Sequence, residues 1–207
     1  ASALAPGACC AAPAEVSYAS DHGAGPTHKP QKGGAVSAQG REELLVGRVV
    51  AVCTSPTGGV PKRPQERIVL GAYGVEGDYH AGPTRLNRHG ETEPNRRQVT
   101  VVSKEVIAAL ERELGCSIPK GGFGENILVE GLDDLAWLAE GDALEFSGGA
   151  AIEITGHNNP CANLQVWHPG IVKAAYGRRG LLAVVLRTGG VAPGDAVAVR
   201  SAAPAPA

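Results

Sequence analysis

Residues 141–155 read Gly-Asp-Ala-Leu-Glu-Phe-Ser-Gly-Gly-Ala-Ala-Ile-Glu-Ile-Thr, and this pattern indicates the fold class. Two short apolar segments, 143–146 and 150–155, are separated by a pair of glycines that suits a tight turn. Ile152 and Ile154 alternate with polar residues, as in a strand with one buried face. We therefore predict two short strands, each bounded by glycine.

The rest of the chain repeats this construction with few interruptions. Further strands are predicted at residues 45–52, 98–102, 126–129, 181–186 and 196–200. A helix is predicted between an N-cap at Ser103 and a stop at Gly115, and a second from Pro169 through Tyr176. Residues 71–98 are glycine-rich and predicted to be irregular. Strands outnumber helices and no βαβ alternation is evident. The prediction is therefore a mainly β (α+β) barrel with one or two covering helices.

Composition and charge exclude several classes of protein. Gly and Pro make up 29 and 15 of the 207 residues, which argues against a helical bundle or coiled coil. Lys and Arg number 19 against 21 Asp and Glu, so neither nucleic acid nor an anionic membrane surface is an expected partner. Of the five cysteines, Cys9 and Cys10 are adjacent in the N-terminal segment, and Cys53, Cys116 and Cys161 show no paired spacing, which argues against a disulfide framework or structural zinc site. A reducing cytoplasm is the expected compartment.

The chain divides unevenly into three parts. Residues 1–43 are rich in Ala, Gly and Pro and hold few large apolar side chains, so a disordered tail is predicted. This segment lacks a basic region followed by a continuous apolar one, and a secretory signal is therefore not expected. Residues 44–200 are predicted to form one folded domain. Residues 201–207 are predicted to form a second loose tail.

Two segments between residues 71 and 98 carry candidate functional groups. Asp78 and His80 stand two residues apart among glycines, and in an extended segment both side chains would point to one face. Such a pair suits proton transfer or the binding of an anion or metal, although a simple glycine-rich turn gives the same pattern. The arginines at 85, 88, 96 and 97 suit phosphate recognition, or else form a solvated loop.

Two further segments follow the first predicted helix. The glycines before Glu125 and Asn126 allow backbone amides to approach an anion, but no P-loop sequence follows them. Cys161 leaves a predicted strand through a proline turn. An accessible thiolate there would be a nucleophile or a soft metal ligand, whereas a buried thiol would simply pack.

Taken in order, these motifs resemble the MOSC domain family, whose members are similar to the C-terminal part of eukaryotic molybdenum cofactor sulfurases. The matching segments are Gly77-Asp-Tyr-His80, Arg97-Gln-Val-Thr100, Gly124-Glu-Asn126, Gly141-Asp142, Pro160-Cys161 and the closing run from Gly180 to Asp195. The resemblance covers about residues 44–200 and is to the small stand-alone bacterial type. It implies a MOSC-like β-barrel.

The resemblance also implies a site centred on one cysteine, which here is Cys161. This residue would ligate the molybdenum of a bound pterin cofactor (molybdopterin) or carry sulfur as a persulfide, with Asp78 and His80 handling protons. The candidate cofactor-binding residues are Arg85, Arg88, Arg96, Arg97, Gly124, Glu125, Asn126 and Asn163. Pyridoxal phosphate is not expected on this chain.

Three functions follow from these residues. The first is a molybdenum-cofactor-dependent enzyme, since some MOSC proteins reduce N-hydroxylated small molecules. The second is a metal-free sulfur carrier or sulfurtransferase that uses a Cys161 persulfide in cofactor or natural-product biosynthesis. The third is a non-catalytic module that binds a small anion. A separate redox protein would supply electrons for the first, and a separate sulfur donor such as a cysteine desulfurase would serve the second.

Overall fold

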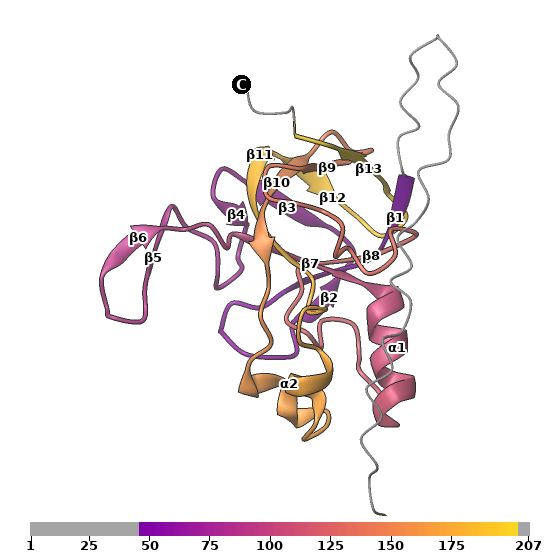
Figure 1. Cartoon of the computed structure of the whole chain (residues 1–207). Coiled ribbons are helices and arrows are strands. Elements are labelled where there is room, and N and C mark those ends of the chain that lie inside the picture. Colours follow the sequence, from indigo (N-terminus) through magenta and orange to yellow (C-terminus); the bar gives the residue numbers. More distant parts are fainter. Residues whose placement is uncertain (1–45, 203–207) are drawn as a thin grey trace, which may run out of the picture. The chain divides into compact units, whose positions relative to one another are not determined.

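The computed structural model of the chain describes residues 46–202. The predicted tail at 1–43, and residues 203–207 of the second, lie outside the described residues. Seven strands form a closed barrel. They are β1 (Val46–Thr54), β7 (Val99–Ser103), β8 (Ile127–Glu130), β9 (Ala143–Phe146), β10 (Ala151–His157), β11 (Leu181–Arg187) and β13 (Ala196–Arg200). The predicted mainly β barrel is confirmed (Figure 1).

The strand order around the barrel is β13-β9-β10-β11-β7-β8-β1, and pairing of β1 with β13 closes it. Strand β2 (Arg63–Gln65) pairs antiparallel with the last residues of β1. A smaller sheet joins β12 (Gly189–Val191), β3 (Ile68–Gly71) and β4 (Gly74–Val75). The two strands predicted within residues 141–155 are β9 and β10, and the structure pairs them antiparallel with Ile152 opposite Leu144.

One parallel pair contradicts the expectation that the chain contains no βαβ unit. Strands β7 and β8 are parallel neighbours, with Val101 opposite Ile127, and helix α1 (Lys104–Leu114) lies in the connection between them. The glycine-rich loop after α1 separates the helix from β8, and this separation hid the alternation in the sequence. Parallel strands require such a crossover.

The apolar residues divide between the inside and the outside of the barrel wall. Leu144, Ile152 and Ile154 are buried in the barrel interior, and the polar neighbours of the two isoleucines are partly exposed. On β7, Val101 faces the interior cluster, whereas Val102 belongs to a second cluster between the wall and the helices. Every residue of β7 is buried, because α1 covers the outer face of that strand.

The predicted N-terminal helix is confirmed in detail. The Ser103 hydroxyl accepts a hydrogen bond from the Val106 amide at 3.2 Å, and Gly115 ends the helix in the left-handed conformation. The second predicted helix is shorter than expected. Only α2 (Ile171–Ala174) is α-helical, and the 3-10 turn η1 (Ala162–Val166) precedes it. Helix α2 starts at Ile171 and ends at Ala174, so the predicted bounds of Pro169 and Tyr176 are wrong; Gly170 provides no side-chain cap at its start.

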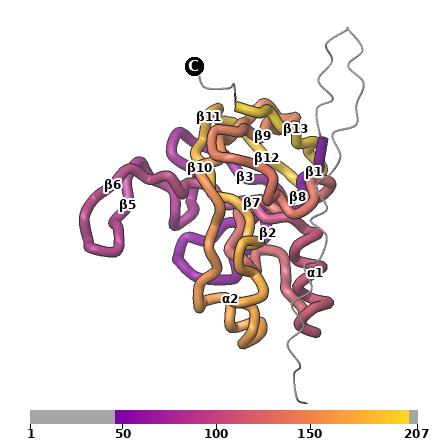
Figure 2. Tube along the Cα trace, in the orientation of Figure 1, coloured from indigo at the N-terminus to yellow at the C-terminus, as the bar shows by residue number. Residues whose placement is uncertain are grey.

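The segment at 71–98 is more regular than its glycine content indicates. Besides β4 it contains β5 (Thr84–Leu86) and β6 (Thr92–Pro94), which pair as a polar hairpin. Figures 1 and 2 show this hairpin projecting from the barrel on the side away from α1. Sequence periodicity did not reveal these strands because they are short and largely exposed. Within residues 46–202, no helix has the length and apolar character needed to cross a membrane.

Candidate functional site

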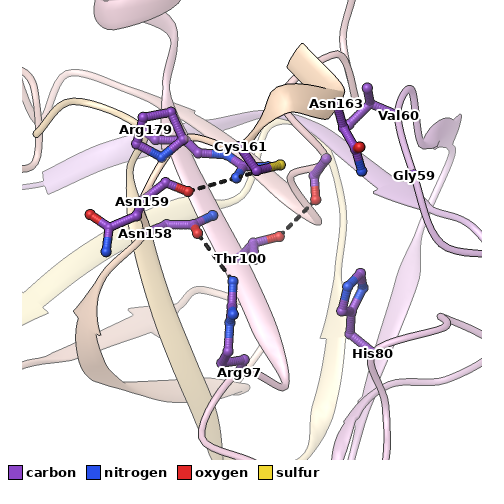
Figure 3. A pocket seen from close by; sticks show the side chains of 12 residues that line it. Gly59, Val60, His80, Arg97, Thr100, Asn158, Asn159, Cys161, Asn163 and Arg179 are labelled. Atoms are coloured by element: carbon purple, nitrogen blue, oxygen red, sulfur yellow. Dashed lines mark hydrogen bonds between the residues drawn. The ribbon is translucent and has the colours of Figure 1, made fainter. Parts of the chain in front are cut away.

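A cavity of about 410 Å³ opens beside β7, and we call it the Cys161 cavity. Six loops, the 3-10 turn η1 (Ala162–Val166) and strand β7 contribute to it, so residues far apart in the sequence meet there. It is lined by Gly59, Val60, His80, Arg97, Thr100, Gly124, Asn158, Asn159, Pro160, Cys161, Asn163 and Arg179. Figure 3 shows Cys161 and Arg179 on one side of this cavity and His80 on the other.

Cys161 presents an exposed thiol to the cavity. Its backbone is extended where the chain enters η1, and its side chain makes no capping hydrogen bond there. The sulfur lies 3.3 Å from Nη1 of Arg179. A guanidinium at this distance stabilises negative charge on the sulfur.

Arg179 is 8% exposed, and hydrogen bonds to two backbone carbonyls hold its guanidinium in place. Nη1 donates to the backbone oxygen of Asn159 at 2.7 Å, and Nη2 donates to that of Phe123 at 3.2 Å. Its Nε atom is buried and has no hydrogen-bond partner among the described residues. The guanidinium is therefore fixed at the thiol, and its Nε donor stays unused.

Arg97 supplies the second positive charge in the cavity. Its Nη2 donates a long hydrogen bond of 3.4 Å to Oδ1 of Asn158, and within the described part of the chain no carboxylate pairs with it. Burial, together with the charges of Arg85 and Arg179, lowers the pKa of Arg97, while Cys161 acts in the opposite direction. Uncompensated guanidinium groups of this kind favour an anionic ligand.

Asp78 lies beneath the cavity rather than in its lining. The carboxylate accepts hydrogen bonds from Nζ of Lys62 at 2.9 Å and from the amides of His80 and Ser55 at 3.0 and 3.1 Å. Burial opposes ionisation of this carboxyl, but the contacts with His80 and Lys62 outweigh it and hold its pKa well below the usual range. Burial lowers the pKa of Lys62, an effect that Asp78 opposes. Asp78 is thus an ionised anchor.

His80 does reach the cavity, and Asp78 orients it. Nδ1 of the imidazole lies 3.3 Å from Oδ1 of Asp78. The expectation that Asp78 and His80 point to one face of an extended segment is wrong. Asp78 begins a turn, in which the Ala81 amide donates to the Asp78 carbonyl at 3.1 Å. The Asp78 side chain therefore faces inward, whereas the His80 side chain faces the cavity.

Glu125 and Asn126 also lie below the lining. The Glu125 carboxylate accepts the amides of Gly121 and Phe123 at 2.6 and 3.0 Å, and burial raises the pKa of this carboxyl despite these hydrogen bonds. The Asn126 amide donates to Asp78 at 3.0 Å. Both residues position the loops around the cavity and do not face it, unlike Gly124 and Asn163, which line it.

The loop that contains Gly121 and Gly124 packs closely against the segment around Lys62, which only glycine permits at Gly121. Gly121 adopts φ +82°, and a Cβ atom there would lie 2.1 Å from the carbonyl oxygen of Lys62. Gly124 adopts φ +78° at the cavity wall. This packing brings the loop against the segment that carries Lys62.

The predicted arginine cluster is split by the structure. Only Arg97 lines the Cys161 cavity, and Arg85 lines neighbouring hollows while pairing with Glu93 at 3.0 Å. Arg96 pairs with Glu140, and Arg88 bonds to His89 on the exposed hairpin. The structure therefore does not bring Arg88 or Arg96 to Cys161.

Sequence reasoning predicted no role for the lining residues Gly59, Val60, Thr100, Asn158, Asn159 and Pro160, and it missed two charged residues, Arg179 and Lys62. Arg179 follows another arginine and precedes a glycine at a predicted strand start, and that position was the one available signal. Lys62 lies in the run Pro61-Lys-Arg-Pro64, and nothing in the sequence indicates that Lys62 is buried while its neighbour Arg63 is exposed. Only the fold shows that Lys62 is 2% exposed and paired with Asp78.

The other cysteines of the described region do not reach the cavity. Cys53 packs in the outer apolar cluster, and burial and the nearby Glu125 raise the pKa of its thiol to about 12. Cys116 packs against the same cluster. Cys161 is thus the exposed thiol of residues 46–202.

The fold and the cavity together define the class of protein, a closed β-barrel with an exposed thiol in an arginine-lined cavity. The chain belongs to the MOSC domain family, whose model matches residues 76–198. It is 34% identical to YuaD of Bacillus subtilis strain 168 over 62% of this chain and 77% of that protein. The name of YuaD assigns it provisionally to metal-sulfur cluster biosynthesis.

Solved structures agree with this family assignment. The crystal structure of YuaD from Bacillus subtilis superposes with a TM-score of 0.72 at 27% identity, covering 78% of this chain and 99% of that one. YiiM from Geobacillus stearothermophilus and YiiM from Escherichia coli give TM-scores of 0.54 and 0.53 at 22% and 21% identity. They cover 76% and 77% of this chain, and 74% and 70% of their own. These last two show the shared fold.

Proposed function

We propose that this chain binds the molybdenum cofactor in the Cys161 cavity and acts on a small N-hydroxylated compound. The observation that carries the proposal is the Cys161 sulfur at 3.3 Å from Nη1 of Arg179, in a cavity that Arg97 also lines. A thiolate is a soft donor that suits molybdenum. The arginines suit the phosphate of the pterin.

The residues present fit such a group. Among the described residues, no three His, Cys, Asp or Glu side chains converge as a metal cage, so Cys161 would be the protein ligand and the pterin would supply the others. Nη1 of Arg179 lies at the thiol, and the buried Nε of the same guanidinium has no partner among the described residues. When bound, the cofactor would supply two-electron reduction of an N–O bond, with electrons from a separate redox protein.

The role of His80 follows from its contacts. With Nδ1 held by Asp78, the Nε2 atom is the position that can exchange a proton in the cavity. Asp78 acts through His80 and is a positioning residue. We expect the reaction to take place in the cytoplasm.

A second candidate function is metal-free sulfur transfer, favoured by the exposure of Cys161. Its thiolate would take the outer sulfur of a donor persulfide, forming a Cys161 persulfide and releasing the donor thiolate. Arg179 would stabilise the anionic sulfur in this case too. The name of the relative YuaD concerns metal-sulfur cluster biosynthesis, which is consistent with sulfur chemistry.

Metal analysis and intact mass of the purified protein separate the two candidates. Stoichiometric molybdenum and pterin that disappear in Cys161→Ser support the first. A sulfur adduct on metal-free protein that dithiothreitol removes, and that Cys161→Ser lacks, supports the second. If neither state forms and activity survives Cys161→Ser, both proposals fail.

A further inference from the structure

A second cavity of about 500 Å³ shares a wall with the Cys161 cavity. We call it the outer cavity, and it is lined by Tyr79, His80, Ala81, Thr84, Arg85, Leu86, Asn95 and Arg97. His80 and Arg97 line both cavities and form the wall between them. A ligand in the outer cavity would therefore lie next to whatever occupies the Cys161 cavity.

The charge of the outer cavity is positive. Arg85 and Arg97 line it, and among the described residues no Asp or Glu does. Glu93 bonds only Nη1 of Arg85, at 3.0 Å, and this leaves the other donors of that guanidinium available. Arg97 lacks a carboxylate partner within residues 46–202, and the charge of Arg85 helps to lower the pKa of Arg97, second to burial. Two close guanidinium groups favour an anion between or beside them.

The remaining walls include an exposed aromatic and an exposed apolar side chain. The side chains of Tyr79 and Leu86 line the cavity and are 62% and 64% exposed. The Tyr79 ring meets the His80 ring edge-on, with centroids 5.3 Å apart. Exposed aromatic and leucine side chains beside cations provide stacking and apolar contact for a flat ring.

The outer cavity is also built on a fixed base. The buried Asn95 side chain donates to the carbonyls of His80 and Gly82 at 2.8 and 3.0 Å, and it accepts the Arg97 amide at 3.0 Å. One side chain thus joins the turn after Asp78 to the start of β7. The wall that carries His80 and Arg97 is held before any ligand arrives.

From these contacts we propose that the outer cavity binds a flat ring that carries an anionic group, with the anion on Arg85 and Arg97 and the ring against Tyr79 and Leu86. Such a molecule would present its far end to the Cys161 cavity across the His80–Arg97 wall. That it is the substrate of the reaction rests on the proposed function, whereas its binding does not.

The test is a titration of the isotopically labelled full chain with benzoate, followed by amide chemical shifts in NMR. Benzamide serves as the neutral isostere. Saturable shifts at residues 79–86 are expected with benzoate. Benzamide is expected to bind about tenfold more weakly, as is benzoate to Arg85→Gln, because a charged hydrogen bond is lost. Arg88→Gln removes the same charge from the same hairpin outside the cavity and should bind as wild type.

Four results would overturn the proposal. They are no shift at residues 79–86 up to about 10 mM benzoate, equal binding of benzamide, wild-type affinity in Arg85→Gln, or shifts confined to residues 158–163. The spectrum of each variant reports its folding directly. Cys161→Ser is expected to bind benzoate normally, so a failure of the cofactor proposal leaves this result intact, and molybdenum binding without benzoate binding refutes only the outer cavity.

Discussion

Replacing Arg179 should slow the chemistry of Cys161 more than any neighbouring change of charge. Two unit charges 3.3 Å apart interact by about 1.3 kcal/mol in water and about 5 kcal/mol at an effective dielectric constant of 20. The Cys161 thiol is exposed, so the lower value applies. A free energy of this size corresponds to about a tenfold change in the rate of a step that develops negative charge on the sulfur. Arg179→Gln is thus expected to reduce the alkylation rate of Cys161 about tenfold at neutral pH.

The assay is iodoacetamide labelling of the metal-free protein, with peptide mass spectrometry to assign each cysteine. Arg178→Gln is the matched control, because Arg178 pairs with Glu113 at 2.7 Å and does not line the Cys161 cavity. It should alkylate at nearly the wild-type rate. Arg179→Lys keeps the charge and should recover part of the rate. If Arg179→Gln melts like wild type and still alkylates at its rate, the electrostatic reasoning is refuted.

Three further outcomes follow from the same structure. Asp78→Asn should lower the free energy of unfolding in urea by about 3–5 kcal/mol at neutral pH, because Lys62 is left buried and unpaired. The fold lowers the pKa of Asp78, so its contribution is complete above about pH 4 and is lost as pH falls further; the gap between variant and wild type should narrow there. Cys53, whose pKa is raised to about 12, should stay unlabelled in native protein at pH 9 while Cys161 reacts, as peptide mapping will show. Ser103→Ala should cost about 1 kcal/mol in the same urea assay through loss of the α1 cap.

Local signals were sufficient for many of the elements. The strand at 143–146 and the closing strand at 196–200 begin and end where the sequence indicates, because each follows a Gly-Asp turn. The α1 helix carries both of its end signals in its own residues. The hairpin strands β5 and β6 carry no such signal, since their pairing depends on each other and not on an apolar face.

For the site, the sequence was sufficient where chemistry depends on residue type. A cysteine after a proline turn, and an aspartate and histidine among glycines, are visible as motifs that resemble a known family. Their spatial roles were not visible. The chain makes a turn at residue 78, so the Asp78 side chain faces inward and pairs with Lys62. It contacts His80 and does not line the cavity.

Sequence alone thus determined that the chain forms a mainly β barrel of the MOSC type with candidate chemistry at Cys161. Apolar alternation, helix caps and glycine turns are local, so they can be read residue by residue. Only the tertiary structure decided which charges meet the thiol. Arg179 reaches Cys161 across 18 residues of chain, whereas Arg88 and Arg96 turn elsewhere. Arg179 and Cys161 lie in different loops, and the folded barrel brings these loops together. The spacing of the two residues in the sequence does not specify this contact.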